Sequence, residues 1–175
     1  MQIDKFPEYS GMRFVVDNAY PIEDSQVCQT LSTSGIRSVE LIRCKSDKLL
    51  FVEAKSSFPN PGNIKTNPDK KNKTGSELFK ERVDEICDKF THSLNLYSAI
   101  DVGVIEEILP EEFNPPERVS LVFVLVINDF EQSWCPPIEK AIKSQLNDSF
   151  CMANIWKPTV YVINHETARR RKIIV

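Results

Sequence analysis

One uninterrupted apolar segment limits what this chain can fold into. The sequence VSLVFVLVI, residues 119–127, is rich in β-branched side chains and contains a single polar residue, Ser120. A segment of this kind is typical of a strand in the middle of a sheet that is covered on both faces. It is far too short to span a bilayer, which needs about 20 apolar residues. We therefore expect a covered β-sheet and no membrane partner.

Strands and helices are expected to alternate along the chain. Apolar residues recur at steps of three and four from Phe79 to Tyr97, which predicts an amphipathic helix from a capping box at Thr74–Glu77 to about residue 99. A second helix is expected after the prolines 136–137, with an apolar stripe formed by Ile138, Ile142, Leu146 and Phe150. Strands are expected at residues 12–16, 36–44, 49–56, 119–127 and 159–163.

This order of elements predicts an α/β fold with a central mixed β-sheet flanked by helices. The length of 175 residues, 41% of them hydrophobic, suits a single domain spanning residues 1–175. Residues 57–75 contain prolines, glycines and almost no apolar side chains, so they are expected to form a long, mobile loop. The five cysteines are odd in number and lack metal-ligand spacing, which indicates a reduced, cytoplasmic protein with buried thiols.

The charge is distributed unevenly along the chain. The formal net charge of −3 does not by itself indicate a nucleic-acid-binding protein. The loop nevertheless carries four lysines that could contact a phosphate backbone: Lys65, Lys70, Lys71 and Lys73. A second basic run covers residues 169–172. Each run is equally compatible with a solvated linker or terminus.

The strands at 36–44 and 49–56 are expected to form a hairpin with unusual chemistry at its end. Closing it with the two-residue turn Ser46-Asp47 and pairing residues outward places Glu40 opposite Glu53. The two carboxylates are then about 5 Å apart at Cβ, an arrangement that destabilises a sheet unless something compensates the charge. Lys55 shares the face of Glu53, because side chains alternate along a strand. A divalent cation with oxygen ligands would provide the compensation.

These residues resemble the signature of the PD-(D/E)XK, or restriction-endonuclease-like, nuclease superfamily. The similarity consists of Glu40, followed thirteen residues later by Glu53-Ala54-Lys55 at the end of an apolar strand. The resemblance implies a restriction-endonuclease-like fold and Mg²⁺- or Mn²⁺-dependent hydrolysis of nucleic-acid phosphodiester bonds. It implies that Glu40, Glu53 and the Ala54 carbonyl bind the metal and that Lys55 assists the attacking water.

The resemblance also carries expectations about partners and further residues. It implies DNA rather than RNA as the more expected nucleic acid, together with a homodimer or a partner protein. Many members have a helix before the hairpin whose glutamate joins the metal site. No clear helix is visible there, and Glu23 is the upstream acid we nominate. On the helix after the hairpin, Lys89 or His92 could line the site.

Two other interpretations remain open. Glu40, Glu53 and Lys55 could form a salt-bridged strand end in which Lys55 neutralises one acid. The chain could also be a catalytically inactive nuclease-like fold that binds nucleic acid or protein, because fold alone does not determine function.

Overall fold

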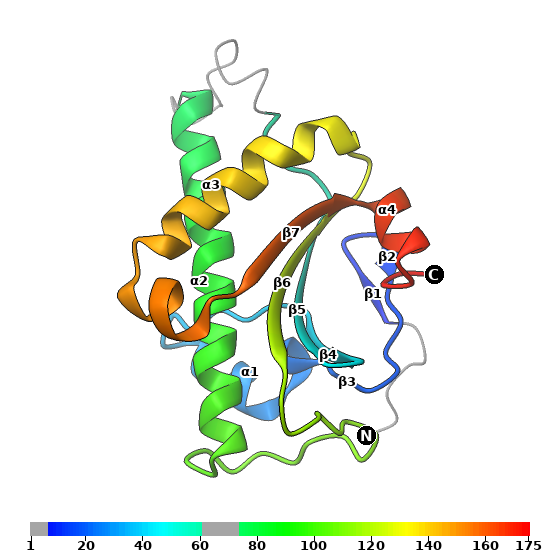
Figure 1. Ribbon diagram of the computed structural model, residues 1–175, viewed down its shortest axis with the longest axis vertical. Helices are drawn as coiled ribbons and strands as arrows, with labels where there is room; N and C mark the ends of the chain where they lie inside the picture. The colour runs from blue at the N-terminus through cyan, green and yellow to red at the C-terminus, as the bar shows by residue number, and fades with distance from the viewer. Residues whose placement is uncertain (1–6, 61–73) are drawn as a thin grey trace.

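A five-stranded sheet organises the chain in the computed structural model, which describes residues 7–60 and 74–175. Its strands lie side by side in the order in which they occur along the chain, β3-β4-β5-β6-β7. Helices pack against it, as Figure 1 shows. The strands of this sheet are β3 (Ala19–Tyr20), β4 (Leu41–Lys45), β5 (Lys48–Lys55), β6 (Ser120–Ile127) and β7 (Thr159–Asn164).

The sheet is mixed, as predicted, and the strand direction changes at β5. Strands β3, β4 and β5 pair antiparallel, whereas β5 pairs parallel with β6 and β6 pairs parallel with β7. Parallel neighbours require crossover connections, which are usually helical. Helices α2 (Gly75–Asp101) and α3 (Cys135–Asn147) follow β5 and β6, and both lie on the same face of the sheet (Figure 1).

The central strand and the long helix agree with the sequence prediction. In β6, the side chains from Val122 to Ile127 are buried on both faces of the sheet. Helix α2 begins with the predicted capping box, in which Thr74 accepts a hydrogen bond from the backbone N–H of Glu77. Its apolar stripe packs on the sheet, where Phe90 stacks on Phe123 with ring centroids 4.5 Å apart. This contact fixes the side of α2 that faces β5.

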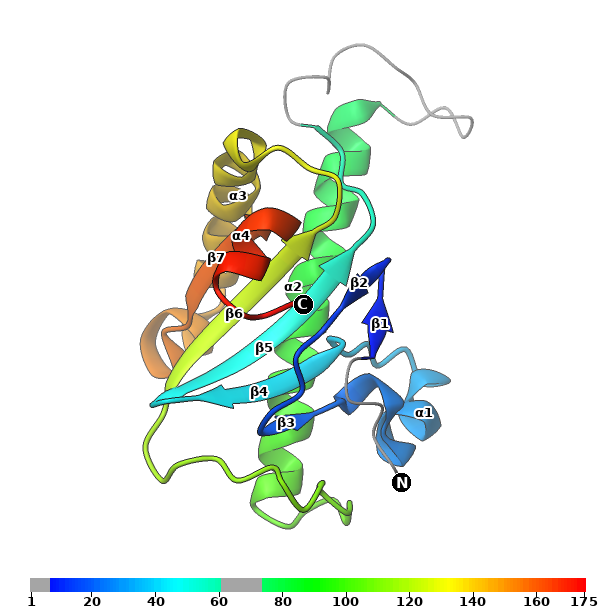
Figure 2. The same cartoon turned by 90° about the vertical axis from the view of Figure 1, so that its right-hand side faces the viewer.

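The other face of the sheet is covered by segments from both ends of the described chain. Figure 2 shows that a small hairpin, β1 (Glu8–Tyr9) and β2 (Met12–Arg13), and the C-terminal helix α4 (His165–Arg170) both lie on this face. Phe14 forms an isolated β-bridge with Ile174, and both side chains are buried. The strand predicted at 12–16 therefore ends early, because the chain after Arg13 pairs with the C-terminal segment rather than with the main sheet.

Two short helices precede the β4–β5 hairpin, where no clear helix was expected. A 3-10 turn, η1 (Ile22–Asp24), contains Glu23. It is followed by α1 (Gln26–Ser32), whose N-cap Ser25 accepts a hydrogen bond from the backbone N–H of Cys28. These elements are too short to show a helical period in the sequence. Capping and packing stabilise them instead.

The strand predicted at 36–44 and the stripe predicted for α3 need correction at their ends. Strand β4 begins only at Leu41, and Glu40 lies at the bend before it. Helix α3 ends at Asn147, so Phe150 falls beyond the helix and is 75% exposed. The chain after α3 forms a π-helical turn, η4 (Met152–Trp156), and the chain before it a 3-10 turn, η3 (Gln132–Trp134).

In residues 7–60 and 74–175, none of the helices combines the length and apolar character needed to cross a bilayer. Four of the five cysteines are buried, and all five are free thiols.

Candidate active site

The β4–β5 hairpin brings the predicted acids together at its open end. The register is the predicted one, with Lys45 paired to Lys48 at the turn and Leu41 paired to Val52 at the far end. Glu40 immediately precedes Leu41, and Glu53 immediately follows Val52. Glu40 is therefore close enough to Glu53 for the charge of Glu53 to raise the pKa of Glu40. The two acids are thus near each other as predicted, although Glu40 precedes β4 and is not itself paired with Glu53 in the sheet.

Glu53 is completely buried and is held by two lysines. Its Oε1 lies 2.9 Å from Nζ of Lys89 and 3.2 Å from Nζ of Lys55. Lys89 donates a hydrogen bond of 3.1 Å to Oε2, whereas Oε1 has no hydrogen-bond partner within the part of the chain that is described. Burial raises the pKa of Glu53, although the neighbouring ammonium groups of Lys89 and Lys55 oppose this shift.

Of the two α2 residues nominated from the sequence, Lys89 is thus the one that reaches Glu53. Burial alone would lower the pKa of its ammonium group, but the charge of Glu53 and its hydrogen bond outweigh burial and raise the pKa. His92 lies one turn further along α2. Its Nδ1 accepts a hydrogen bond of 3.2 Å from the backbone N–H of Arg37, so it contacts the loop before β4 instead.

Lys55 points from the end of β5 towards α2 and contacts a second acid that the sequence analysis missed. Its Nζ donates a hydrogen bond of 2.6 Å to Oε1 of Glu85, whose Oε2 accepts one of 2.8 Å from Arg82. Burial alone would raise the pKa of Glu85, but the hydrogen bonds from Lys55 and Arg82 hold it at about 2. Lys55 is therefore oriented by a permanently charged partner. No spacing in the sequence marks this pair, because Lys55 and Glu85 lie on different elements.

Glu23 joins the acids from the other side of the site. Burial, a hydrogen bond with the Glu23 carboxyl group and the charge of Glu53 together raise the pKa of Glu40 to about 9. Oε1 of Glu23 also lies 3.9 Å from Nζ of Lys89. The upstream acid nominated from the sequence is thus at the site, on a 3-10 turn.

The carbonyl of Ala54 points towards the side on which β4 has ended. The carbonyl of the next residue, Lys55, accepts a hydrogen bond of 2.8 Å from the backbone N–H of Asn128 on the β6 side. Successive carbonyls of a strand point to opposite edges, so the Ala54 carbonyl faces the opposite edge of β5. There it accepts a hydrogen bond of 3.1 Å from the Ser10 hydroxyl in the β1–β2 turn.

The oxygen atoms of these groups are of the kind that binds a hard divalent cation. They are not yet arranged as a complete set of metal ligands. Carboxylate and carbonyl oxygens are the ligands that Mg²⁺ and Mn²⁺ prefer. Burial, together with the nearby carboxyl groups of Glu23 and Glu53, raises the pKa of Glu40, a shift that a bound cation would oppose. Within residues 7–60 and 74–175, however, no three acidic, histidine or cysteine side chains already form a metal-binding group. Lys89 occupies the position nearest to Glu53 instead.

A pocket of about 330 Å³ opens beside these acids. Its lining includes Glu23, Lys89, Ser38 and Cys28, and the Cys28 Sγ and the Ser38 Oγ are 2.9 Å apart. The pocket gives a ligand access to the polar ends of Glu23 and Lys89.

Of the two basic runs in the sequence, only the C-terminal one can be placed. Lys65, Lys70, Lys71 and Lys73 lie outside the described residues. Arg170, Arg171 and Lys172 line a separate pocket on the other face of the sheet.

No protein-family model, curated protein or solved structure matches the chain. The site is therefore interpreted from its own geometry.

Proposed function

We propose that the protein is a Mg²⁺- or Mn²⁺-dependent nuclease with a restriction-endonuclease-like fold. The observation that carries the proposal is the placement of Glu53, fully buried at the end of a central strand, with Glu40 next to it and Lys55 on the same face. The topology supports it, because the β4–β5 hairpin is followed by helix α2 and the apolar strand β6, as the sequence resemblance implies. Nucleic acid is the proposed substrate, with DNA favoured over RNA.

Each residue has a defined role in this proposal. Glu40, Glu53 and the Ala54 carbonyl hold the cation, and Glu23 is close enough to Glu40 to help balance the charge. The cation, when bound, supplies Lewis acidity towards water and phosphate. Lys55, held in place by Glu85, orients the attacking water and stabilises charge that develops on the phosphate. Lys89 would have to move away from Glu53 to make room for a cation there, because its ammonium group and the cation are both positively charged.

The proposal is tested by a cleavage assay on single-stranded and duplex DNA and RNA, with Mn²⁺ or Mg²⁺ and with EDTA. Cleavage is expected only with metal, and Lys55→Ala is expected to reduce its rate by at least about 100-fold. The matched control is Lys80→Ala, because Lys80 lies on α2 and is 77% exposed in its side chain. Cleavage that survives Lys55→Ala would refute the assigned mechanism.

A second candidate function is a nuclease-like binding module without turnover. It is favoured by the contact of Glu53 with both Lys55 and Lys89 and by the absence of a ready metal-binding group in residues 7–60 and 74–175. Binding to nucleic acid or to a protein without metal-dependent cleavage of any substrate would support it. A metal site can be tested separately by diffraction from crystals soaked in Mn²⁺, where an anomalous peak between Glu40 and Glu53 supports the nuclease. For either function, we expect the protein to act as a homodimer or with a partner protein.

A further inference from the structure

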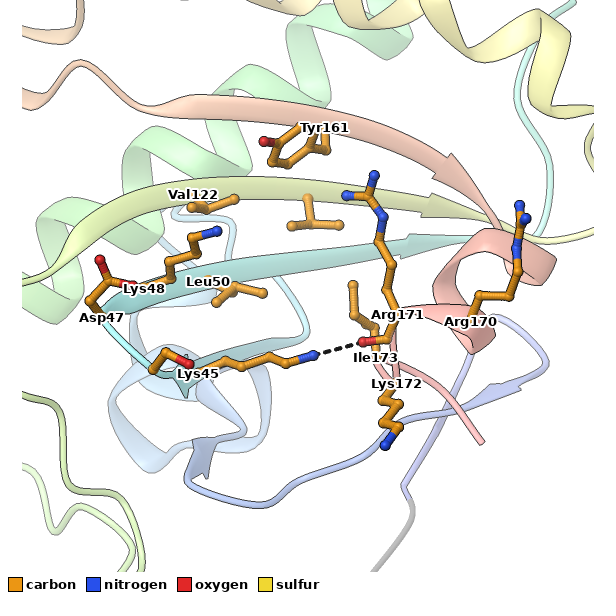
Figure 3. Close-up of a pocket in the computed structure, with 12 residues that line it drawn as sticks. Lys45, Asp47, Lys48, Leu50, Val122, Tyr161, Arg170, Arg171, Lys172 and Ile173 are labelled. Atoms are coloured by element: carbon orange, nitrogen blue, oxygen red, sulfur yellow. Dashed lines mark hydrogen bonds between the residues drawn. The ribbon is translucent and has the colours of Figure 1, made fainter.

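A larger pocket, of about 560 Å³, lies on the face of the sheet opposite α2 and α3 (Figure 3). Its floor consists of apolar side chains from β5 and β6, with Tyr161 of β7 at one side. Its walls come from two segments far apart in the sequence, the β4–β5 turn and the residues that end α4. The basic residues that line it are Lys45, Lys48, Arg170, Arg171 and Lys172.

Within residues 7–60 and 74–175, the positive charge of this basic pocket is only partly balanced. Asp47 is the acidic residue that lines it. Within the described chain, none of its five basic side chains makes a salt bridge. Partial burial and the neighbouring charges of Arg43, Lys172, Lys48 and Arg171 lower the pKa of Lys45. The basic groups therefore repel one another, and an anion among them would relieve this repulsion.

Hydrogen bonds hold the two walls together in spite of this repulsion. Lys45 donates through Nζ to the carbonyl of Arg171 over 2.8 Å, and Arg43 donates through Nη1 to the carbonyl of Lys172 over 2.7 Å. The first of these bonds is the dashed line in Figure 3. Lys172 has a φ of 57°, a left-handed conformation that costs a residue with a side chain some free energy. The backbone at the end of α4 is thus fixed against the turn.

The guanidinium group of Arg171 is also positioned. It lies over the ring of Tyr161, 5.1 Å from the ring centroid, a cation–π contact. In Figure 3, Arg171 rises from the wall towards Tyr161, and Lys48 extends over the floor towards Val122. Both side chains therefore reach across the same floor from opposite walls.

We propose that this basic pocket binds a small ligand with two or more neighbouring phosphates, such as a nucleoside triphosphate. Its volume is in the range of small-ligand sites. Arginine and lysine together suit phosphate, because a guanidinium group binds two oxygens in a fork and an ammonium group acts as a point charge. The turn Ser46-Asp47 and the segment after α4 close the pocket on two sides, which favours a compact polyphosphate over a long strand.

This site is independent of the proposed nuclease activity. The floor residue Leu50 packs in the apolar cluster of one face, whereas Phe51 packs in the cluster of the other. Glu53, two residues after Phe51 on β5, shares the face of Phe51 and contacts Lys89 of α2. The basic pocket therefore lies across the sheet from the candidate active site. Binding there is expected to need no divalent cation.

The test is calorimetric titration of the full chain with ATP and with inorganic tripolyphosphate, in EDTA so that metal-mediated binding is excluded. Both ligands are expected to bind and to compete with each other. Lys48→Ala and Arg171→Ala are each expected to weaken binding about tenfold or more, as charge-assisted hydrogen bonds require. Both side chains are exposed, so the variants should remain folded, which circular dichroism verifies. Lys140→Ala on α3, also exposed but on the other face, is the matched control.

Several results would overturn the proposal. The proposal is refuted if neither ATP nor tripolyphosphate binds in EDTA. It is also refuted if the two pocket variants bind these ligands as tightly as the wild type. Binding of a single-stranded oligonucleotide that tripolyphosphate does not displace would show that the surface recognises a strand and not a small polyphosphate. Loss of nuclease activity in an active-site variant with unchanged ATP binding would leave the proposal intact.

Discussion

The stability of the protein is expected to depend on pH through Glu40, and Glu40→Gln is the variant that reveals it. Burial, the hydrogen bond with Glu23 and the charge of Glu53 raise the pKa of Glu40 from 4.5 to about 9 in the folded protein. Between these two values the folded state binds a proton that the unfolded state releases. The free energy of unfolding therefore falls as pH rises through this range. A glutamine at this position keeps the neutral hydrogen-bonding group and loses the titration.

The size of this change in the free energy of unfolding follows from the difference between the folded and unfolded pKa values of Glu40. Each pH unit between the unfolded and folded pKa values costs about 1.4 kcal/mol, so the ceiling at pH 7.5 is about 4 kcal/mol. Glu23 and Glu53 share the local charge and can take part of the proton, which reduces the effect. We expect Glu40→Gln to become more stable than the wild type by about 2 kcal/mol between pH 5 and pH 7.5.

The measurement is urea unfolding of both proteins in EDTA at several values between pH 5 and pH 8. Glu112→Gln is the matched control, because Glu112 is exposed in the loop before β6 and its substitution should leave the pH profile of the wild type unchanged. The expected result is a gap between Glu40→Gln and the wild type that widens with pH. A constant gap across this range would refute the assignment of the raised pKa to Glu40.

Three further perturbations are expected to change stability for separate reasons. Lys89→Met leaves the buried Glu53 with a single ammonium partner and should lower the free energy of unfolding by about 3 kcal/mol, measured with urea in EDTA. Added Mn²⁺ should reduce this loss. An unchanged unfolding midpoint would contradict the pairing of Lys89 with Glu53. Thr74→Ala removes the side-chain cap of α2 and should cost about 1 kcal/mol, measured the same way. Gly11→Ala should cost about 1–2 kcal/mol, because φ is +75° and the new Cβ would lie 3.1 Å from Nδ2 of Asn128. A thermal-unfolding midpoint for Gly11→Ala equal to that of the wild type would show that the turn adapts at no cost.

The hairpin that carries the acids was predictable because its signals are local. A two-residue turn fixes the register, and parity then places Glu40 by Glu53 and Lys55 on the face of Glu53. The helical periodicity along α2 and the continuous apolar run of β6 are also local signals. The sheet, its mixed pairing and the two principal acids therefore follow from the sequence.

The residues that complete the site depend on how distant elements pack. Glu85 and Lys89 reach Lys55 and Glu53 only because the stacking of Phe90 on the sheet turns one side of α2 towards β5. The turn that carries Glu23 is too short to leave a periodic pattern. Lys89 and Glu23 could be nominated from the sequence, but their contacts, and the role of Glu85, are visible only in the structure.

The pairing of Phe14 with Ile174 has a consequence for the order in which the molecule assembles. Every strand of the main sheet pairs with its neighbour in the chain, so the sheet can grow by adding one strand at a time. The bridge between Phe14 and Ile174, with its hydrogen bond from Val15 to Ile173, instead joins the two ends of the described chain. Its loop-closure entropy is the largest of any pairing here, so it should form last and open first. Amide exchange at Val15 and Val175 would then need only the local opening of this pairing between residues 13–15 and 173–175. The amides of β6 would exchange only when the whole sheet unfolds.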